Sequence, residues 1–180
     1  MKRVFIGGSR HVRHLNDDIR HRLDQIIERR MNILIGDANG ADKAIQRYLH
    51  ENEYKNVVVF CTGGECRNNI GGWPVRSVPP PHKIKDFDYY TAKDIVMANE
   101  TDAGFMVWDG ESTGTIVNVA RLLSNGKIVS IYISSKKSFF TLNTIADLDK
   151  LISLSPYDVK KRIDRSIEKN VHDYIQSALF

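Results

Sequence analysis

The chain has 180 residues, of which 42% are hydrophobic and 27% charged, and its formal net charge is +4. This composition is typical of one globular domain, spanning 1–180, with no apolar span long enough for a membrane helix and no signal-peptide pattern at its start. Two cysteines, Cys61 and Cys66, are too few for a disulfide framework, and no second Cys/His pair stands at zinc-ligand spacing. We therefore expect a cytoplasmic protein with no membrane partner, no bound metal and no cofactor.

The positive charge permits an anionic ligand but does not single out nucleic acid. The densest basic stretches, 10–30 and 160–165, are interleaved with Asp and Glu and contain no run of aromatic residues. A solvated mixed surface is the simpler interpretation. We do not expect a nucleic-acid partner.

The first third of the chain alternates strand and helix patterns. An apolar run at Val4–Ile6 predicts a strand, and the Asn-Asp-Asp start predicts a helix over 16–30 with apolar residues on one face. A short strand over 32–35 and a helix over 41–50 follow. Four consecutive apolar residues at 57–60 predict a strand buried on both faces, which completes a βαβαβ order.

Residues 61–86 interrupt the alternation, with two Gly-Gly pairs and a run of three prolines. A segment of this length inside a compact domain is typical of a functional loop or of a disordered one. Arg67, Trp73 and Arg76 favour an ordered loop that faces a ligand, and surface decoration is the alternative.

The alternation then resumes, with a helix over 87–98, a strand over 103–108, a helix over 115–123 and a strand over 127–133. Strands that alternate with helices predict an α/β fold with a doubly wound, mostly parallel sheet covered by helices on both faces. The core of this fold spans about 3–133.

A helical extension over about 143–180 follows the core. It comprises a short helix around 146–152 and a long amphipathic helix that begins near Pro156. The apolar stripe of the long helix runs through Val159, Ile163, Ile167, Val171, Tyr174 and Ile175. This stripe can pack on the sheet or against its counterpart in a homodimer, and the sequence does not separate the two.

Three glycine-rich turns, each between a predicted strand and a predicted helix, predict a ligand site. Parallel strands bring such loops to one edge of the sheet, where backbone N–H groups and helix N-termini bind phosphate. In the first loop, Gly7 and Gly8 allow close approach, Ser9 offers a hydroxyl and Arg10 a bidentate fork.

The second loop contains Gly36, Asp37, Ala38, Gly40 and Asp42. Asp37 stands where a carboxylate accepts a hydrogen bond from a ribose hydroxyl or an amine. Asp42 falls in the first turn of a helix, so it either contacts the ligand or stabilises the helix N-terminus. We expect the two glycines to adopt positive φ or to allow close approach.

The third loop precedes the helix over 115–123. Its hydroxyls and N–H groups form a candidate anion cradle at Ser112, Thr113, Gly114 and Thr115. Because carboxylates repel phosphate, we expect Asp109 and Glu111, on either side of Gly110, to face a sugar, a base or their own backbone.

These three loops, read in order with Lys93, Asp94 and Met97 on an intervening helix, resemble the SLOG superfamily. SLOG proteins are Rossmann-like and are related to DNA-processing protein A and the "lonely guy" phosphoribohydrolases. The resemblance covers about 3–133 and is closest to the small stand-alone members. It implies a Rossmann-like fold that binds or senses a nucleotide or a nucleotide-derived small molecule.

One position departs from the enzymes of that superfamily. Their last loop is followed by a catalytic Glu three positions after the Thr, and here Thr115 is followed at that spacing by Asn118, which cannot ionise. A binding or sensing role is therefore our first hypothesis. The alternative is hydrolysis of an N-glycosidic bond, as in a nucleoside monophosphate phosphoribohydrolase or a deoxyribosyltransferase, with Asp109 and Glu111 as candidate catalytic residues.

Overall fold

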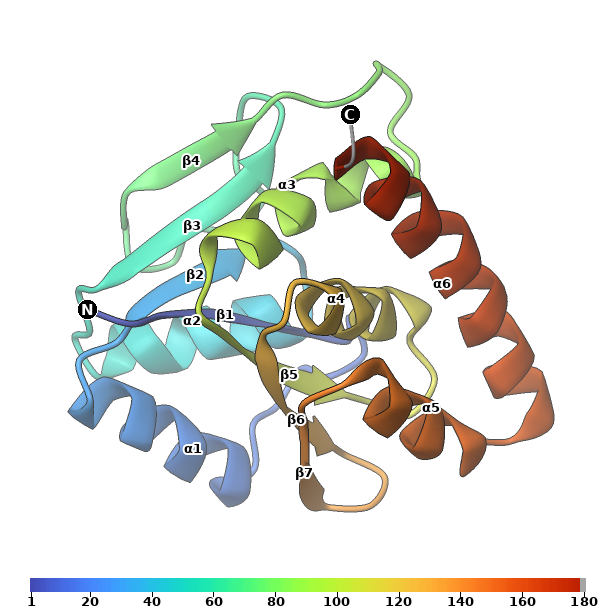
Figure 1. Ribbon diagram of the computed structural model, residues 1–180. Coiled ribbons are helices and arrows are strands. Elements are labelled where there is room, and N and C mark those ends of the chain that lie inside the picture. The colour runs from blue at the N-terminus through green and yellow to red at the C-terminus, as the bar shows by residue number, and fades with distance from the viewer. Residues whose placement is uncertain (179–180) are drawn as a thin grey trace.

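The structure is a computed structural model that describes residues 1–178, with 172–178 described by their backbone alone. Its centre is one seven-stranded sheet in the order β4-β3-β2-β1-β5-β6-β7 (Figure 1). All neighbouring strands are parallel except β7, which runs antiparallel to β6. The strands are β1 (Arg3–Gly8), β2 (Asn32–Gly36), β3 (Val57–Thr62), β4 (Val75–Val78), β5 (Ala103–Trp108), β6 (Ile128–Ile133) and β7 (Ser138–Leu142).

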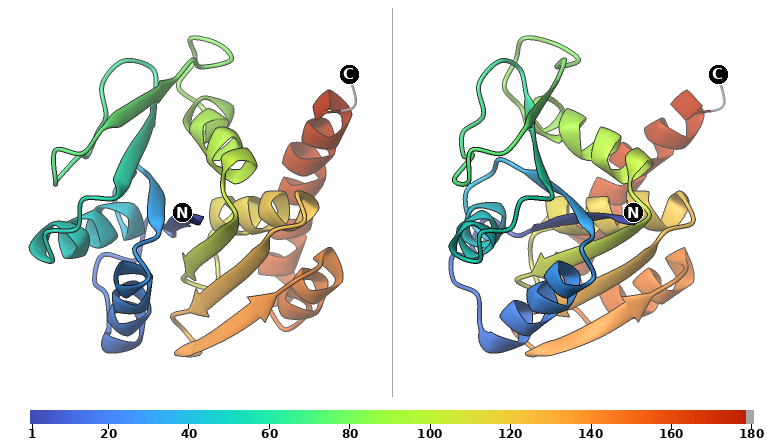
Figure 2. Two further views of the ribbon diagram at one scale, coloured as in Figure 1. Left: turned by 60° about the vertical axis from the view of Figure 1, so that its left-hand side comes forward. Right: turned by 90° about the vertical axis from the view of Figure 1, so that its left-hand side faces the viewer.

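Helices cover both faces of this sheet. The described residues form α1 (Asp17–Glu28), α2 (Ala41–Glu51), α3 (Phe87–Glu100), α4 (Thr113–Ser124), α5 (Ile145–Ser153) and α6 (Tyr157–Ala178). Helices α1 and α2 pack on one face, and α3, α4, α5 and α6 lie on the other (Figure 2, left). Within residues 1–178, none of these helices has both the length and the apolar character that a membrane crossing requires.

The two hydrophobic cores follow from the strand pleat. Alternate strand residues point to opposite faces, so Ile6 joins the core beneath α1 and α2, whereas Phe5 joins the core beneath α3 and α4. Strands buried on both faces read as continuous apolar runs, as Val57–Phe60 does. The doubly wound α/β fold predicted from the sequence is confirmed.

Strand β1 marks the point where the winding of the sheet reverses. It pairs with β2 on one side and with β5 on the other, and the chain proceeds outward from each of these strands. In open α/β sheets, ligands bind outside the carboxyl ends of the strands at such a switch point. The loops after β1, β2 and β5, which carry the three glycine-rich turns, all begin at this edge.

Two strands were not predicted. The segment 61–86, expected to be a loop, contains the end of β3 and the edge strand β4, three of whose four residues are exposed. Strand β7 follows a turn after β6 and includes Phe139, which packs edge-on against Tyr132. Both strands lie at edges of the sheet, where pairing with one neighbour requires no long apolar run.

The long C-terminal helix packs within its own chain. Val159, Ile163 and Val171 of α6 are buried in the same core as the apolar face of α4. This part of the apolar stripe is therefore occupied inside the subunit, while Tyr174 and Ile175 lie outside the described side chains. The homodimer remains a prediction.

The first and second loops are held together by a close approach at Gly40. This residue has φ +88°, and a Cβ placed on it would lie 2.2 Å from the carbonyl oxygen of Arg10. The expectation of positive φ or close approach is confirmed at Gly40 by both criteria. At Gly36 it is confirmed by proximity, because a Cβ there would lie 2.5 Å from Asp42 Oδ2.

We predict that Gly40→Ala destabilises the fold by at least about 2 kcal/mol, because it combines a backbone conformation almost restricted to glycine with a steric clash. Gly126→Ala is the matched control, since Gly126 also has positive φ (+68°) but has no atom within 4 Å of its Cβ position. We expect it to cost about 1 kcal/mol. Urea denaturation of both variants tests this, and equal losses would contradict the steric contribution.

Candidate functional site

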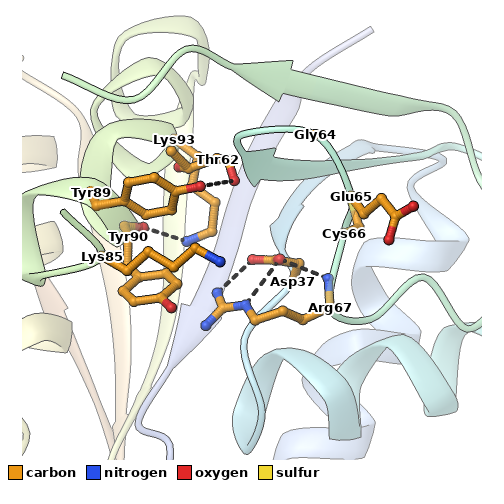
Figure 3. A pocket seen from close by; sticks show the side chains of 10 residues that line it. All are labelled: Asp37, Thr62, Gly64, Glu65, Cys66, Arg67, Lys85, Tyr89, Tyr90 and Lys93. Atoms are coloured by element: carbon orange, nitrogen blue, oxygen red, sulfur yellow. Dashed lines mark hydrogen bonds and ion pairs between the residues drawn. The ribbon is translucent and has the colours of Figure 1, made fainter. Parts of the chain in front are cut away.

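Two adjoining cavities lie at the carboxyl edge of the sheet and together form the candidate site, which we call the cleft. The tyrosine cavity, of about 440 Å³, lies between the end of β2, the loop after β3 and the start of α3 (Figure 3). The glycine cavity, of about 80 Å³, lies between the first and third loops, α3 and α4. Arg67, Tyr90 and Lys93 line both cavities.

Asp37 is held by Arg67, on the loop after β3. The guanidinium makes a two-pronged contact, from Nη2 to Oδ1 (2.7 Å) and from Nε to Oδ2 (3.1 Å), and the backbone N–H of Arg67 donates to Oδ2 at 3.0 Å (Figure 3). Burial works to raise the pKa of Asp37, but the contacts with Arg67 and the charge of Lys93 outweigh it and hold that pKa below its ordinary value. Asp37 therefore anchors the loop as an ionised carboxylate.

The same arginine shapes the wall of the tyrosine cavity. Its guanidinium lies over the ring of Tyr90, 4.7 Å from the ring centroid. Tyr89 packs edge-on against Tyr90, and its hydroxyl donates to the carbonyl of Thr62 at 3.4 Å. The cavity thus has an aromatic wall from α3 facing a polar loop, with the exposed Lys85 at its rim (Figure 3).

A group of charges is buried between α3 and the second loop. Lys93 is 4% exposed, and its Nζ donates to Asp94 Oδ1 at 2.7 Å and to the Tyr90 carbonyl at 3.1 Å. Burial works to lower the pKa of Lys93, but Asp94 and Asp42 outweigh it and raise that pKa, so the amine stays protonated.

Asp42 sits in the space that Gly7 and Gly36 leave open. It is 7% exposed, lines the glycine cavity and accepts the backbone N–H of Ala38 at 3.2 Å. Burial raises the pKa of Asp42 to about 7, against the favourable charge of Lys93. Asp42 both lines the glycine cavity and lies in the first turn of α2, so the two roles that the sequence left open for it stay predictions.

Asn118 is also part of this buried polar network. Its Nδ2 donates to Asp94 Oδ2 at 3.0 Å, and its Oδ1 accepts from Arg121 at 2.9 Å. Both ends of the amide are therefore occupied. At this position the side chain connects α4 to α3 and lines the glycine cavity.

Ser9 joins the first loop to the third. It is fully buried, its Oγ lies 3.1 Å from Thr115 Oγ1, and it accepts the backbone N–H of Asp109 at 3.1 Å. The hydroxyl of Ser9, which sequence analysis assigned to a phosphate, thus makes hydrogen bonds within the protein. Arg10, next to it, is exposed and lines the glycine cavity.

Asp109 organises its own loop. Its Oδ1 accepts the N–H groups of Glu111 at 2.9 Å and Ser112 at 2.8 Å, and its Oδ2 lies 3.1 Å from His11 Nδ1. Burial works to raise the pKa of Asp109, but these hydrogen bonds outweigh it and keep that pKa below its ordinary value. The carboxylate therefore faces its own backbone amides, one of the partners that sequence analysis foresaw.

The N-terminus of α4 has no side-chain cap. Asn16, Asp86 and Thr144 cap α1, α3 and α5 through their side chains, whereas Ser112 at the start of α4, like Gly40 at the start of α2, makes no such bond. The first N–H groups of a helix have no partner within the helix. Those of α4 border the glycine cavity, where Gly114 leaves open space, its nearest contact being Phe87 at 3.8 Å from the Cβ position.

The structure brings most of the predicted residues to the cleft. Those that line the glycine cavity are Gly7, Gly8, Arg10, Ala38, Asp42, Ser112, Gly114 and Thr115, and Asp37 lines the tyrosine cavity. The predicted residues that do not line either cavity are Ser9, Gly36, Gly40, Asp109, Gly110, Glu111 and Thr113. The two candidate catalytic carboxylates are in this second set.

Sequence reasoning singled out Lys93 and Asp94 of α3, which line the glycine cavity, but missed the aromatic residues of this helix. Of the three residues singled out in 61–86, Arg67 lines the cleft, while Trp73 is buried with its Nε1 donating to the Tyr54 carbonyl, and Arg76 pairs with Glu100. Tyr89 and Tyr90 were not predicted as site residues. The signal that could have found them is β4, because a strand there places the start of α3 at the ligand-binding edge.

Comparison with protein-family models, curated proteins and solved structures finds no match to this chain. The fold class and the cleft therefore rest on the structure, and the SLOG resemblance remains a hypothesis.

The raised pKa of Asp42 predicts a specific dependence of stability on pH. Between its ordinary pKa of 3.8 and its folded value of about 7, the folded state keeps a proton that the unfolded state has lost. The contribution of Asp42 to the free energy of unfolding therefore falls as pH rises from about 4 to about 7. We expect Asp42→Asn to remove this pH-dependent contribution, because an amide does not titrate. The amide oxygen can still accept the backbone N–H of Ala38, so the local hydrogen bond is kept.

Urea denaturation at pH 4.5, 5.5, 6.5 and 7.5 measures the effect as a difference between Asp42→Asn and the unmodified protein, so that titrating groups that do not interact with Asp42 cancel. The variant should gain stability relative to the unmodified protein as pH rises. A difference that does not change with pH would show that Asp42 titrates normally.

Proposed function

We propose that this protein binds or senses a nucleotide or a nucleotide-derived small molecule in the cleft, as the SLOG resemblance implies. The observation that carries the proposal is the position of the cleft. It lies at the switch point of a doubly wound sheet, beside the uncapped N-terminus of α4. Cytoplasmic location and a homodimer belong to the same proposal.

In this proposal the phosphate lies at the glycine cavity. The N–H groups at the start of α4 and the helix dipole favour an anion there, and Gly7, Gly8 and Gly114 allow close approach. Arg10, which has no carboxylate partner among the described residues, provides a charge-assisted donor.

The nucleoside part occupies the tyrosine cavity. A volume of about 440 Å³ falls in the range of small-molecule sites, and the aromatic wall of Tyr89 and Tyr90 suits a planar base. Polar groups from Glu65 and Lys85 also line this cavity and supply an acceptor and a donor for base or ribose. Asp37 acts by holding Arg67 against Tyr90.

A binding role fits the state of the carboxylates better than hydrolysis does. Asn118 replaces the carboxylate of the related enzymes and is engaged at both ends, and Asp109 is saturated by its own loop. Neither provides an ionised group free to attack or to stabilise a sugar cation.

One observation favours the alternative, an N-glycosidase. With a pKa of about 7, Asp42 is partly protonated at neutral pH and lines the cleft, as a general acid that protonates a leaving base must. Asp94 lines the same cavity and carries the negative charge that an oxocarbenium-like transition state requires. Its pairing with Lys93 opposes this role.

The binding proposal is tested with Gly114→Ala. The added methyl group meets no protein atom closer than 3.8 Å, so the fold should be retained, and helix propensity should favour the variant by up to about 1 kcal/mol. Because the methyl group occupies the space assigned to the phosphate, affinity should fall by about tenfold or more. Calorimetry with the four common ribonucleoside monophosphates measures this, and unchanged affinity would remove the phosphate from the glycine cavity.

The enzymatic alternative is tested by chromatography of free bases. We expect the unmodified protein to release no base from the same four monophosphates, because no carboxylate stands at position 118. Base release that disappears in Asp42→Asn and persists in Asn118→Ala would instead establish the glycosidase, with Asp42 as its acid.

A further inference from the structure

A second hollow adjoins the cleft on the side of α2. It has a volume of about 450 Å³ and lies between the loop after β1 and α2 with the two residues that precede that helix. Its charged or ionisable lining residues are Arg10, Arg13, His14, Lys43 and Arg47, and we call it the basic pocket. No acidic side chain lines it in the part of the chain that the structure describes.

Arg10, Arg13 and Arg47 are exposed and Lys43 is half-buried, and these four cations lack the carboxylate partners that three other cations of the chain have. Arg67 pairs with Asp37, Arg76 with Glu100 and Lys93 with Asp94. By contrast, none of the described carboxylates lies within ion-pair distance of the three arginines and the lysine of the basic pocket. Four like charges gathered around one hollow repel one another, and an anionic ligand relieves that repulsion.

The basic pocket and the cleft meet at Arg10, which lines both the pocket and the glycine cavity. The backbone of Arg10 lies close to Gly40 at the start of α2, because a Cβ placed on Gly40 would lie 2.2 Å from the carbonyl oxygen of Arg10. A ligand that occupies the cleft can therefore extend past Arg10 into the basic pocket. The molecule therefore has two neighbouring hollows suited to negative charge, which share Arg10 as a lining residue.

We propose that the basic pocket is a second phosphate subsite, so that the preferred ligand is a nucleotide with at least two phosphate groups rather than a nucleoside monophosphate. This inference rests on the proposed function and specifies its ligand class. The first phosphate lies at α4, and the further phosphates, as in a nucleoside triphosphate or a dinucleotide, contact Arg13, Lys43 and Arg47.

The shape and chemistry of the pocket favour a small molecule over a nucleic-acid strand. Its volume lies in the range of small-molecule sites. Sites for single strands combine a basic groove with aromatic side chains on which bases stack, and none of the described aromatic residues lines this pocket.

The test compares two double variants that remove the same charge. Lys43→Gln with Arg47→Gln removes two cations from the basic pocket. Arg29→Gln with Lys55→Gln removes two exposed cations that precede β2 and β3, at the opposite edge of the sheet. Calorimetry in 150 mM salt measures the affinity of each protein for adenosine and guanosine mono- and triphosphates, the dinucleotide pApA and inorganic tripolyphosphate.

In the unmodified protein, at least one triphosphate or pApA should bind about tenfold more tightly than its monophosphate. The pocket variant should lose about tenfold or more of this affinity while its monophosphate affinity changes less than about twofold, and the control variant should keep both. A higher affinity for a triphosphate than for its monophosphate indicates a polyphosphate chain in the basic pocket, and a higher affinity for pApA indicates a dinucleotide.

Other outcomes overturn the inference separately from the proposed function. If monophosphates bind in the cleft but further phosphates add nothing, or the control variant loses as much affinity as the pocket variant, the second subsite is wrong and the proposed function stands. If tripolyphosphate binds through Lys43 and Arg47 but no nucleotide binds, the proposed function fails and with it the ligand class. Tighter binding of a 12-residue oligodeoxynucleotide than of any small molecule, lost in the pocket variant, would replace the inference with nucleic-acid recognition.

Discussion

The arrangement of the whole site depends on the hydrogen bonds of one buried serine. Ser9 donates its N–H to the Val107 carbonyl, and its own carbonyl accepts the N–H of Ala41 at the start of α2. Its hydroxyl contacts Thr115 of α4 and accepts the N–H of Asp109. A single residue after β1 is thus bonded to both neighbouring loops, which is why the starts of α2 and α4 stand on either side of Arg10.

Charge is distributed unequally around this centre. Inside the cleft, Arg67 and Lys93 form ion pairs with carboxylates, each with an N···O distance of 2.7 Å. These pairs hold Tyr90 and the loop after β3 in place, and breaking a buried pair leaves an uncompensated charge. The unpaired cations lie at the rim and in the basic pocket, where solvent screens their charges when no anion is bound. Positioning and ligand attraction are therefore carried by different residues.

The candidate site shows where reasoning from sequence succeeds and where it stops. The three glycine-rich loops could be predicted because glycine and helix-start residues after an apolar run have a local physical meaning. The pairing of Asp37 with Arg67 could not, because the two residues are brought together by the order of β2 and β3 and by a loop with no periodic pattern. The backbone amides of the third loop were one of three partners expected for Asp109, because they are close in sequence, whereas the contact between Asp94 and Asn118, which lie on different helices, was not predicted.

The amino-acid sequence by itself determined the alternation of strands and helices, the parallel sheet and the positions of its three loops, because apolar periodicity and glycine act over a few neighbouring residues. Only the tertiary structure decided which side chains face the cleft. It buried Asp42 and so raised the pKa of Asp42 despite the opposing charge of Lys93, it turned Ser9 inward, and it gathered Arg13 and Arg47 from separate elements into one pocket. Burial and charge pairing are properties of residues distant in the chain, and packing alone sets them.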